Sequence, residues 1–415
     1  MMKRNRLSNG LRVVTEHTTT VQSMTIGIWI KTGSRYETAE ENGISHFLEH
    51  MFFKGTVHRS AAEIAESFDK IGGDVNAFTS KEYTCFYAKV LDKHTKTALS
   101  ILADMLFHST FDQEEIEKEK QVVMEEIKMV EDTPDDIIHD YLDREAFGHH
   151  PLARPILGTE ESVRAFTRDG ILDFRERHYT AGNMVISLVG NESSELIEQL
   201  ERLFGGLPRG YVEQPFEKPL FLPGKTGIQK ETEQAHLCIG FPGAPMDDEA
   251  MYPLMLMNNA LGDSMSSRLF QRIREDRGLA YSVFSYHVPF LDTGMLTIYA
   301  GTGLKQQEEA AAAVFEVVEN IAADGLTDKE IENGKEQLKG NIILGLESTS
   351  SRMSRNGKNE LMLGRHRTLE DTVQRLDHVT KEDIQQTASA MFRSDYALSF
   401  ISDNGLIPSV GKENG

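Results

Sequence analysis

The chain has 415 residues, with 65 Asp and Glu against 44 Lys and Arg, so its formal net charge is −21. This length predicts two or three domains with ample core, and the acidity argues against nucleic-acid binding, which needs clustered Lys and Arg. The charge is compatible with basic peptides as partners and equally with a solubilising surface. Two cysteines, Cys85 and Cys238, cannot build a disulfide framework.

No stretch of the sequence predicts passage into or across a membrane. The first residues are basic, but no apolar segment of about 7–15 residues follows them, so we expect no secretory signal. No window approaches about 18 consecutive apolar residues, which excludes a membrane span. We therefore expect a cytoplasmic protein.

The first half of the chain mixes hairpins with helices. Asn9-Gly10 is a turn signal within an N-terminal hairpin, and 24–30 has strand character. A hairpin is also expected within 74–90, after the paired glycines Gly72-Gly73, which end a helix. The remaining predicted elements are helices over 44–53, 61–71, 96–107, 113–130, 134–147 and 169–178, and a strand over 184–189.

The second half repeats the pattern of the first. The strand residues 26–30 are echoed by 237–241, Glu115 by Glu330, and Thr167 by Thr380, at spacings of 211, 215 and 213 residues. A two-fold duplication explains this constant register. We predict an α+β fold of two homologous domains, each a largely antiparallel sheet packed with helices. Their boundaries are 1–210 and 228–415, joined by a Gly- and Pro-rich linker over 211–227.

The strongest local motif is His46-Phe47-Leu48-Glu49-His50, within the helix predicted over 44–53. Helical residues i, i+3 and i+4 share a face, so both imidazoles and the carboxylate point the same way. Two histidines one turn apart can bind one Zn²⁺, and the carboxylate can then accept a proton from the metal-bound water.

A surface helix with two solvated histidines is the alternative. The apolar neighbours argue against it, because they surround the helix nearly completely and predict burial. Polar groups on a buried helix need a partner, which favours a metal. These neighbours are Ile44, Phe47, Leu48, Met51, Phe52 and Phe53.

The helix predicted over 113–130 offers two candidates for a third ligand. Glu119 and Glu126 lie on the border of its apolar stripe, where a carboxylate is costly unless a cation or hydrogen bonds receive it. They could also lie just outside the core. The geometry of the helix does not choose between them.

Two segments closely resemble the pitrilysin-type inverzincin metallopeptidases, peptidase family M16. They are HFLEHMFFKGT at 46–56 and GGDVNAFTSKE at 72–82. The resemblance covers essentially the whole chain, and is closest to the processing-peptidase-like branch, which includes the β subunit of mitochondrial processing peptidase and bacterial relatives.

The resemblance implies a complete set of zinc-site residues. In this family the third ligand is a glutamate about 76 residues after the second histidine, which is Glu126 here. An acidic residue one helical repeat earlier supports catalysis, which is Glu119. One Zn²⁺ per chain would thus be held by His46, His50 and Glu126, with Glu49 as the general base.

The second half has lost these ligands. Met257, Ala260 and Leu261 stand at the positions that echo His46, Glu49 and His50, and Asn341 echoes Glu126. We therefore expect no such metal in the second domain.

The resemblance also implies residues that contact the substrate. Arg274 and Tyr281 match a family pair that reaches the substrate carbonyl, where a guanidinium and a phenol can stabilise an oxyanion. Residues 73–79 resemble the strand that pairs with the peptide. The predicted substrate contacts are Gly73, Asn76, Ala77, Phe78 and Glu82, although Glu82 could equally be a solvated strand residue.

These features predict a zinc-dependent endopeptidase that hydrolyses peptides, or unfolded and presequence-like segments, with the zinc-bound water as nucleophile. Relatives enclose a chamber with four homologous domains, so the resemblance implies that this chain forms half of a clamshell. A homodimer, or a heterodimer with a homologous subunit, would complete it. The alternative is a non-catalytic or partner-dependent subunit of such an assembly, although every ligand position is intact here.

Overall fold

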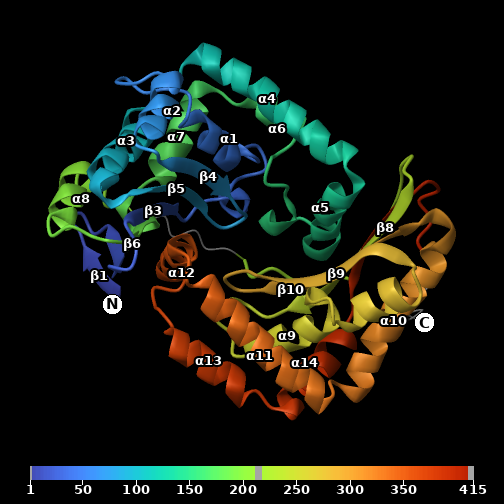
Figure 1. Cartoon of the computed structure of the whole chain (residues 1–415). Coiled ribbons are helices and arrows are strands. Elements are labelled where there is room, and N and C mark those ends of the chain that lie inside the picture. Colours follow the sequence, from blue (N-terminus) through green and yellow to red (C-terminus); the bar gives the residue numbers. More distant parts are fainter. Residues whose placement is uncertain (1, 211–216, 410–415) are drawn as a thin grey trace. The chain divides into compact units, whose positions relative to one another are not determined.

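The computed structural model describes residues 2–210 and 217–409. Within them the chain forms two compact units that are not continuous in sequence. Of the described residues, the first unit comprises 2–128, 154–210 and 344–366, and the second comprises 129–153, 217–343 and 367–409. Figure 1 shows the elements of each unit.

The first unit contains β1 (Met2–Arg6), β2 (Arg12–His17), β3 (Ser23–Ile30), α1 (Ile44–Met51), α2 (Ala61–Lys70), β4 (Asp74–Thr79), β5 (Thr84–Leu91), α3 (Thr95–His108), most of α4 (Gln113–Asp132), α6 (Glu160–Ala165), α7 (Arg168–His178), β6 (Met184–Gly190), α8 (Leu196–Phe204) and α12 (Thr349–Met362). The second contains α5 (Pro134–Phe147), β7 (Lys225–Gln229), β8 (Gln234–Gly243), α9 (Met251–Asn258), β9 (Ala280–Pro289), β10 (Gly294–Gly303), α10 (Gln307–Asp324), most of α11 (Asp328–Gly345), α13 (Leu369–His378), α14 (Lys381–Phe392) and β11 (Ala397–Ser402).

The two sheets share one topology. The first has the strand order β1-β2-β6-β3-β5-β4, and the second has β7-β11-β8-β10-β9. Without the N-terminal strand β1, the orders correspond strand for strand. Each sheet is antiparallel except for one parallel pair, β2 with β6 and β7 with β11. The predicted fold class, an α+β fold of two homologous domains with largely antiparallel sheets, is confirmed.

The predicted domain boundaries do not coincide with the compact units, because the two halves exchange a helix. α12, from the second half, packs on β3 and β6 of the first unit, and α5, from the first half, packs on β8 and β11 of the second. Of the predicted linker 211–227, residues 211–216 lie outside the described residues, and β7 already begins at Lys225.

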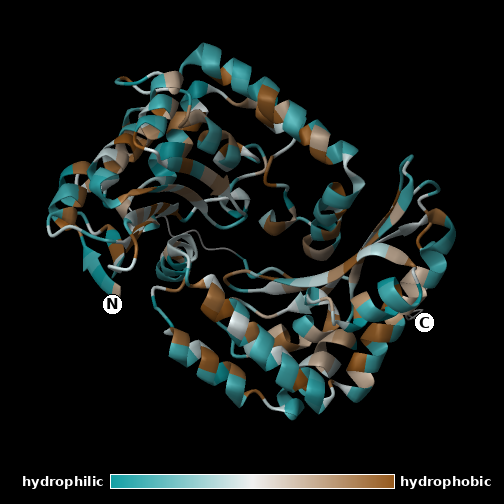
Figure 2. Cartoon of the chain, in the orientation of Figure 1, coloured by the Kyte–Doolittle hydropathy of each residue, from teal (hydrophilic) through white to brown (hydrophobic). Residues whose placement is uncertain are grey.

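Both faces of the first sheet are buried at its central strand β3. One side of β3 carries Met24, Ile26, Ile28 and Ile30 into a core shared with α1, α3 and α7. The other side carries Thr25, Gly27 and Trp29 against α12, where Met353 lies 3.4 Å from the Trp29 indole nitrogen. Figure 2 shows teal and brown alternating along the outer helices, as expected for amphipathic helices that cover a core. Among the described residues, no helix is both long and apolar enough to cross a membrane.

The close approach of α12 to the sheet generates the first prediction. A Cβ on Gly357 would lie 2.5 Å from Cδ1 of Trp29, whose side chain is buried, so Gly357→Ala must displace the indole. We expect the free energy of unfolding to fall by about 1–3 kcal/mol in urea titrations, as for other overpacked cores.

The matched control is Gly340→Ala in α11, where nothing lies within 4 Å of the added Cβ. There the better helix propensity of alanine should raise the free energy of unfolding by about 0.5–1 kcal/mol. Equal effects at the two glycines would contradict the described packing of α12.

Candidate metal centre

The helix α1 begins in a buried loop that is held by one carboxylate. Gly43 precedes the helix with φ of 94°, and a Cβ there would lie 2.5 Å from the carbonyl oxygen of Leu157. The Glu37 side chain accepts hydrogen bonds from the backbone N–H groups of Gly43 (2.7 Å) and Ser45 (2.9 Å) and from the Asn42 amide (3.1 Å). Burial raises the pKa of Glu37, and these hydrogen bonds oppose that rise. Glu37 thus satisfies N–H groups at the helix start that have no partner within the helix.

The motif on α1 brings two imidazoles together with a carboxylate of α4. The rings of His46 and His50 are 4.5 Å apart between centroids, and Nε2 of each lies 3.8 Å from Oε2 of Glu126. One donor atom from each residue lies within 4.8 Å of the other two. Burial, with the nearby His50, lowers the pKa of His46 to about 3, so its imidazole is neutral and carries a free lone pair. This donor set suits a transition metal.

Glu119, the other carboxylate on the border of the α4 stripe, contacts the opposite side of His50. Its Oε1 lies 2.7 Å from Nδ1 of His50, and its Oε2 lies 2.5 Å from Nζ of Lys54. Burial raises the pKa of Glu119, but the hydrogen bonds from His50 and Lys54 outweigh it and hold the pKa low. The ionised carboxylate accepts the Nδ1 proton, which leaves Nε2 of His50 facing Glu126. The two glutamates therefore take different places around one imidazole.

Glu49 points its carboxylate toward the end of β4. It is 9% exposed, and Oε2 accepts a hydrogen bond from the hydroxyl of Thr79. Burial raises the pKa of Glu49, and the Thr79 hydrogen bond opposes the rise. Thr79 lies 30 residues after Glu49, and no sequence pattern links the two, because only the packing of β4 against α1 brings them together.

The strand β4 forms the edge of its sheet. It pairs with β5 along one side and is the last strand in the described order. Gly73 immediately precedes it, and the Asn76 side chain accepts a hydrogen bond from the N–H of Ala77. Phe78 is 38% exposed and packs edge-on against Trp29. An edge strand of this kind offers unpaired backbone groups to an extended chain.

Glu82 occupies a different environment from the other predicted substrate contacts. Its side chain is 3% exposed and forms an ion pair with the buried Arg35 at 2.6 Å. A carboxylate enclosed in this way has almost no surface to offer a peptide, which argues against the predicted substrate contact at Glu82.

Arg274 and Tyr281 lie together in the second unit. Arg274 is in the π-helical segment Phe270–Asp276, and Tyr281 is in β9. The guanidinium carbon lies 4.9 Å from the centre of the Tyr281 ring, and Tyr281 is 77% exposed. Both side chains have polar groups that can face solvent or a ligand.

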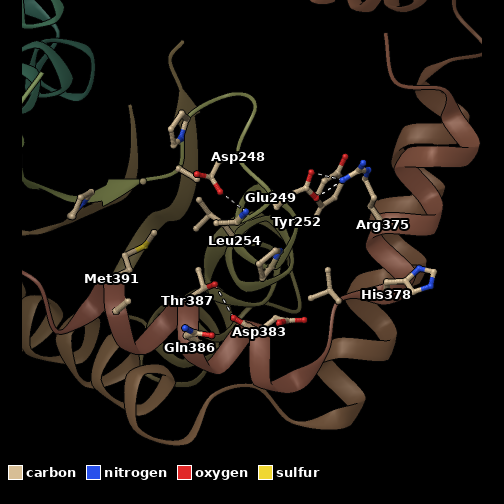
Figure 3. A pocket seen from close by; sticks show the side chains of 18 residues that line it. Asp248, Glu249, Tyr252, Leu254, Arg375, His378, Asp383, Gln386, Thr387 and Met391 are labelled. Atoms are coloured by element: carbon tan, nitrogen blue, oxygen red, sulfur yellow. Dashed lines mark hydrogen bonds and ion pairs between the residues drawn. The ribbon is translucent and has the colours of Figure 1, made fainter. Parts of the chain in front are cut away.

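The second unit has no counterpart of the metal-ligand cluster among its described residues. Met257 and Leu261, at the positions of the two histidines, are fully buried in the apolar core, and Ala260 is 8% exposed. Asn341, which echoes Glu126, is exposed on α11. The unit does contain a cavity of about 750 Å³. Figure 3 shows Arg375 at the wall of this cavity, directed toward Glu249, with which it forms an ion pair.

Each half of the chain matches a known protein family. Residues 12–160 match the family described as insulinase (peptidase family M16), and residues 165–338 match the family described as peptidase M16 inactive domain. The inactive-domain match agrees with the loss of metal-ligating side chains in the second half.

Sequence relatives and solved structures cover nearly the entire chain. An uncharacterized zinc protease of Bacillus subtilis, YmxG, is 55% identical over 99% of this chain and 100% of its own length. An uncharacterized zinc protease of Streptomyces coelicolor is 40% identical over 96% of this chain and 89% of its own length. The fold matches a crystal structure of a protease from Helicobacter pylori with a TM-score of 0.90 at 22% identity, over 97% of this chain and 99% of that one.

The buried cap of α1 generates the second prediction. Glu37→Ala removes the acceptor for three hydrogen bonds at the start of the helix and leaves buried donors unpaired. We expect the free energy of unfolding to fall by about 2–3 kcal/mol. The exposed Glu40, three residues later, is the control, and Glu40→Ala should change it by less than about 0.5 kcal/mol. Similar losses at both positions in urea titrations would show that Glu37 is not the cap.

Proposed function

The chain belongs to peptidase family M16, and from this premise we propose that it is a zinc-dependent endopeptidase that hydrolyses peptides or unfolded segments. The observation that carries the proposal is the convergence of His46, His50 and Glu126, with Glu49 on the same helix as the two histidines. The relatives named zinc proteases support the choice of metal.

The donor set fits a catalytic zinc ion. Ligand atoms bound to tetrahedral Zn²⁺ at about 2.0–2.2 Å stand roughly 3.3–3.5 Å apart, close to the 3.8 Å between Glu126 Oε2 and each histidine Nε2. Three protein ligands leave one position open for water or substrate, as catalytic sites require. When bound there, Zn²⁺ lowers the pKa of water and polarises the scissile carbonyl.

Glu49 is assigned the proton transfers. It accepts a proton from the attacking water and later passes it to the leaving amine, which is the role of a general base that becomes a general acid. Burial raises its pKa toward the working pH, which suits a group that must both gain and lose a proton. The Thr79 hydroxyl holds one carboxylate oxygen and so limits the orientations of the other.

Glu119 acts through His50 rather than on the substrate. By accepting the Nδ1 proton of His50, it orients the ring and directs Nε2 to the metal position. Lys54 binds its second oxygen and keeps the carboxylate ionised and in place. We therefore assign Glu119 as a positioning residue.

The substrate is bound as an extended strand. The exposed edge of β4, preceded by Gly73 and including Asn76, Ala77 and Phe78, can pair with backbone groups of almost any peptide sequence. The net charge of −21 favours basic peptides. The assignment of Arg274 and Tyr281 to the negative charge on the substrate carbonyl rests on the sequence resemblance. We also propose that the chain forms half of a closed chamber and that a second copy or a homologous subunit completes it. The proposed location is the cytoplasm.

Glu49→Gln tests the mechanism. The amide keeps the size of the side chain but cannot accept the proton, so hydrolysis of a quenched basic peptide should fall by about 10²–10⁴-fold with zinc content unchanged. A chelator should abolish the activity of the wild type. Equal activity in Glu49→Gln would overturn the assignment, and an inactive but zinc-loaded wild type would favour the non-catalytic or partner-dependent subunit.

Glu126→Ala tests the third ligand against its neighbour Glu125. Glu126 faces both histidines, whereas Glu125 is exposed and paired with Lys128. We expect Glu126→Ala to weaken zinc binding by at least about tenfold and Glu125→Ala to leave it unchanged, as measured by metal content after dialysis. A zinc content of Glu126→Ala equal to that of the wild type would contradict the assignment.

A further inference from the structure

A second group of metal-ligating side chains lies in the first unit and shares no residue with the candidate metal centre. It consists of His58, in the loop after α1, and Asp104 and His108, which are one turn apart on α3. One nitrogen of each histidine and one carboxylate oxygen lie within 4.8 Å of one another. No role described above uses these residues.

The two oxygens of Asp104 have separate partners. Oδ2 accepts hydrogen bonds from the Thr56 hydroxyl (2.8 Å) and from Nη1 of Arg59 (2.5 Å). Oδ1 is hydrogen-bonded to Nδ1 of His108 at 3.0 Å and lies 3.8 Å from Nε2 of His58. The Arg59 side therefore stabilises the ionised carboxylate and leaves its other oxygen to the histidines.

The His58 ring lies beside Asp104 and against the ring of His108, without a hydrogen bond to the carboxylate. A separation of 3.8 Å is too long for a hydrogen bond, and the His58 ring makes none among the described residues. Ligand atoms around one tetrahedral ion stand about 3.3 Å apart. The His58–Asp104 separation is therefore close to that of two ligands of one ion, and all three donor atoms lie within 4.8 Å of one another.

The backbone holds the loop of His58 against the end of α3. The N–H of Val57 donates to the carbonyl of His108 (2.9 Å), and Thr56 pairs with Ser109 as an isolated bridge. The Thr56 hydroxyl oxygen also accepts the N–H of His58 at 3.0 Å. A donor set held by the main chain loses little conformational freedom when an ion binds, which favours affinity.

The group is accessible from solvent. The side chains of His58 and His108 are 59% and 50% exposed, whereas Asp104 is 6% exposed beneath them. All three line a cavity of about 930 Å³ that also has Arg175 and Arg202 at its wall. The cavity wall also carries Arg59 and Glu176, and an ion bound by the three residues would be reachable from this cavity.

We propose that His58, Asp104 and His108 form a second metal site, which binds one Zn²⁺ ion per chain with an open coordination position. Two imidazoles and a carboxylate suit Zn²⁺ better than Mg²⁺ or Ca²⁺, which prefer oxygen ligands. The site goes beyond the proposed peptidase function and does not depend on it.

The test is zinc stoichiometry of the full-length chain, measured by equilibrium dialysis against free Zn²⁺ and elemental analysis. We expect two ions per wild-type chain, and one after His58→Ala or His108→Ala, with the affinity of the second ion reduced at least about tenfold. His149→Ala, which removes an exposed histidine outside both groups, should retain two ions. A wild type that saturates at one ion, or a second ion unaffected by both substitutions, would overturn the proposal.

Two further measurements separate misfolding of a variant from loss of a site, and one zinc site from the other. His58 is an exposed loop residue, so His58→Ala should keep the wild-type circular dichroism and decides the test if His108→Ala does not fold. Glu126→Ala should remove the other ion and leave the His58-dependent one. Failure of the proposed catalytic site would appear as zinc binding insensitive to Glu126→Ala, whereas failure of the second site would appear as insensitivity to His58→Ala.

Discussion

The candidate metal centre depends on the burial of a helix that carries three polar side chains. Phe47 and Leu48 anchor α1 in the core with no exposed surface, and burying each contributes about 1.5–3 kcal/mol. The same burial removes water from the polar face, so each polar group there needs a partner. Glu37 accepts hydrogen bonds from the N–H groups at the helix start, and Glu119 accepts one from His50. The hydroxyl of Thr79 donates one to Glu49. Packing and chemistry therefore constrain each other at this helix.

The exchange of helices makes the duplicated halves depend on each other. α12 covers the face of the first sheet that carries Trp29, and α5 covers the corresponding face of the second sheet, where Ser399 donates a hydrogen bond to the carbonyl of Ile138. Without the exchanged helix, each sheet would expose an apolar face. We infer that neither half of the sequence can bury both faces of its sheet alone. This mutual dependence has persisted although the second half lacks the metal ligands.

Local patterns in the sequence predicted most of the elements, and long-range contacts explain what they missed. The spacing of His46, Glu49 and His50 and the apolar residues around them predict a buried helix, and α1 spans 44–51. Glu37 lies before that helix without any pattern that marks it as a cap. The partner of Glu82 is Arg35, 47 residues away, so an alternating strand pattern could not reveal its burial. The exchange of α12 and α5 joins segments hundreds of residues apart, beyond the reach of local periodicity.

The two metal-ligand groups of the first unit have the same construction but different surroundings. In each, one turn of a helix supplies two ligands, His46 and His50 on α1 or Asp104 and His108 on α3, and a third comes from another segment. The histidines of α1 are mostly buried, so electrostatic interactions there are stronger and water access is restricted. Those of the second group are at least half exposed, and solvent weakens their hold on an ion. Burial therefore favours tighter retention of an ion by the first group than by the second.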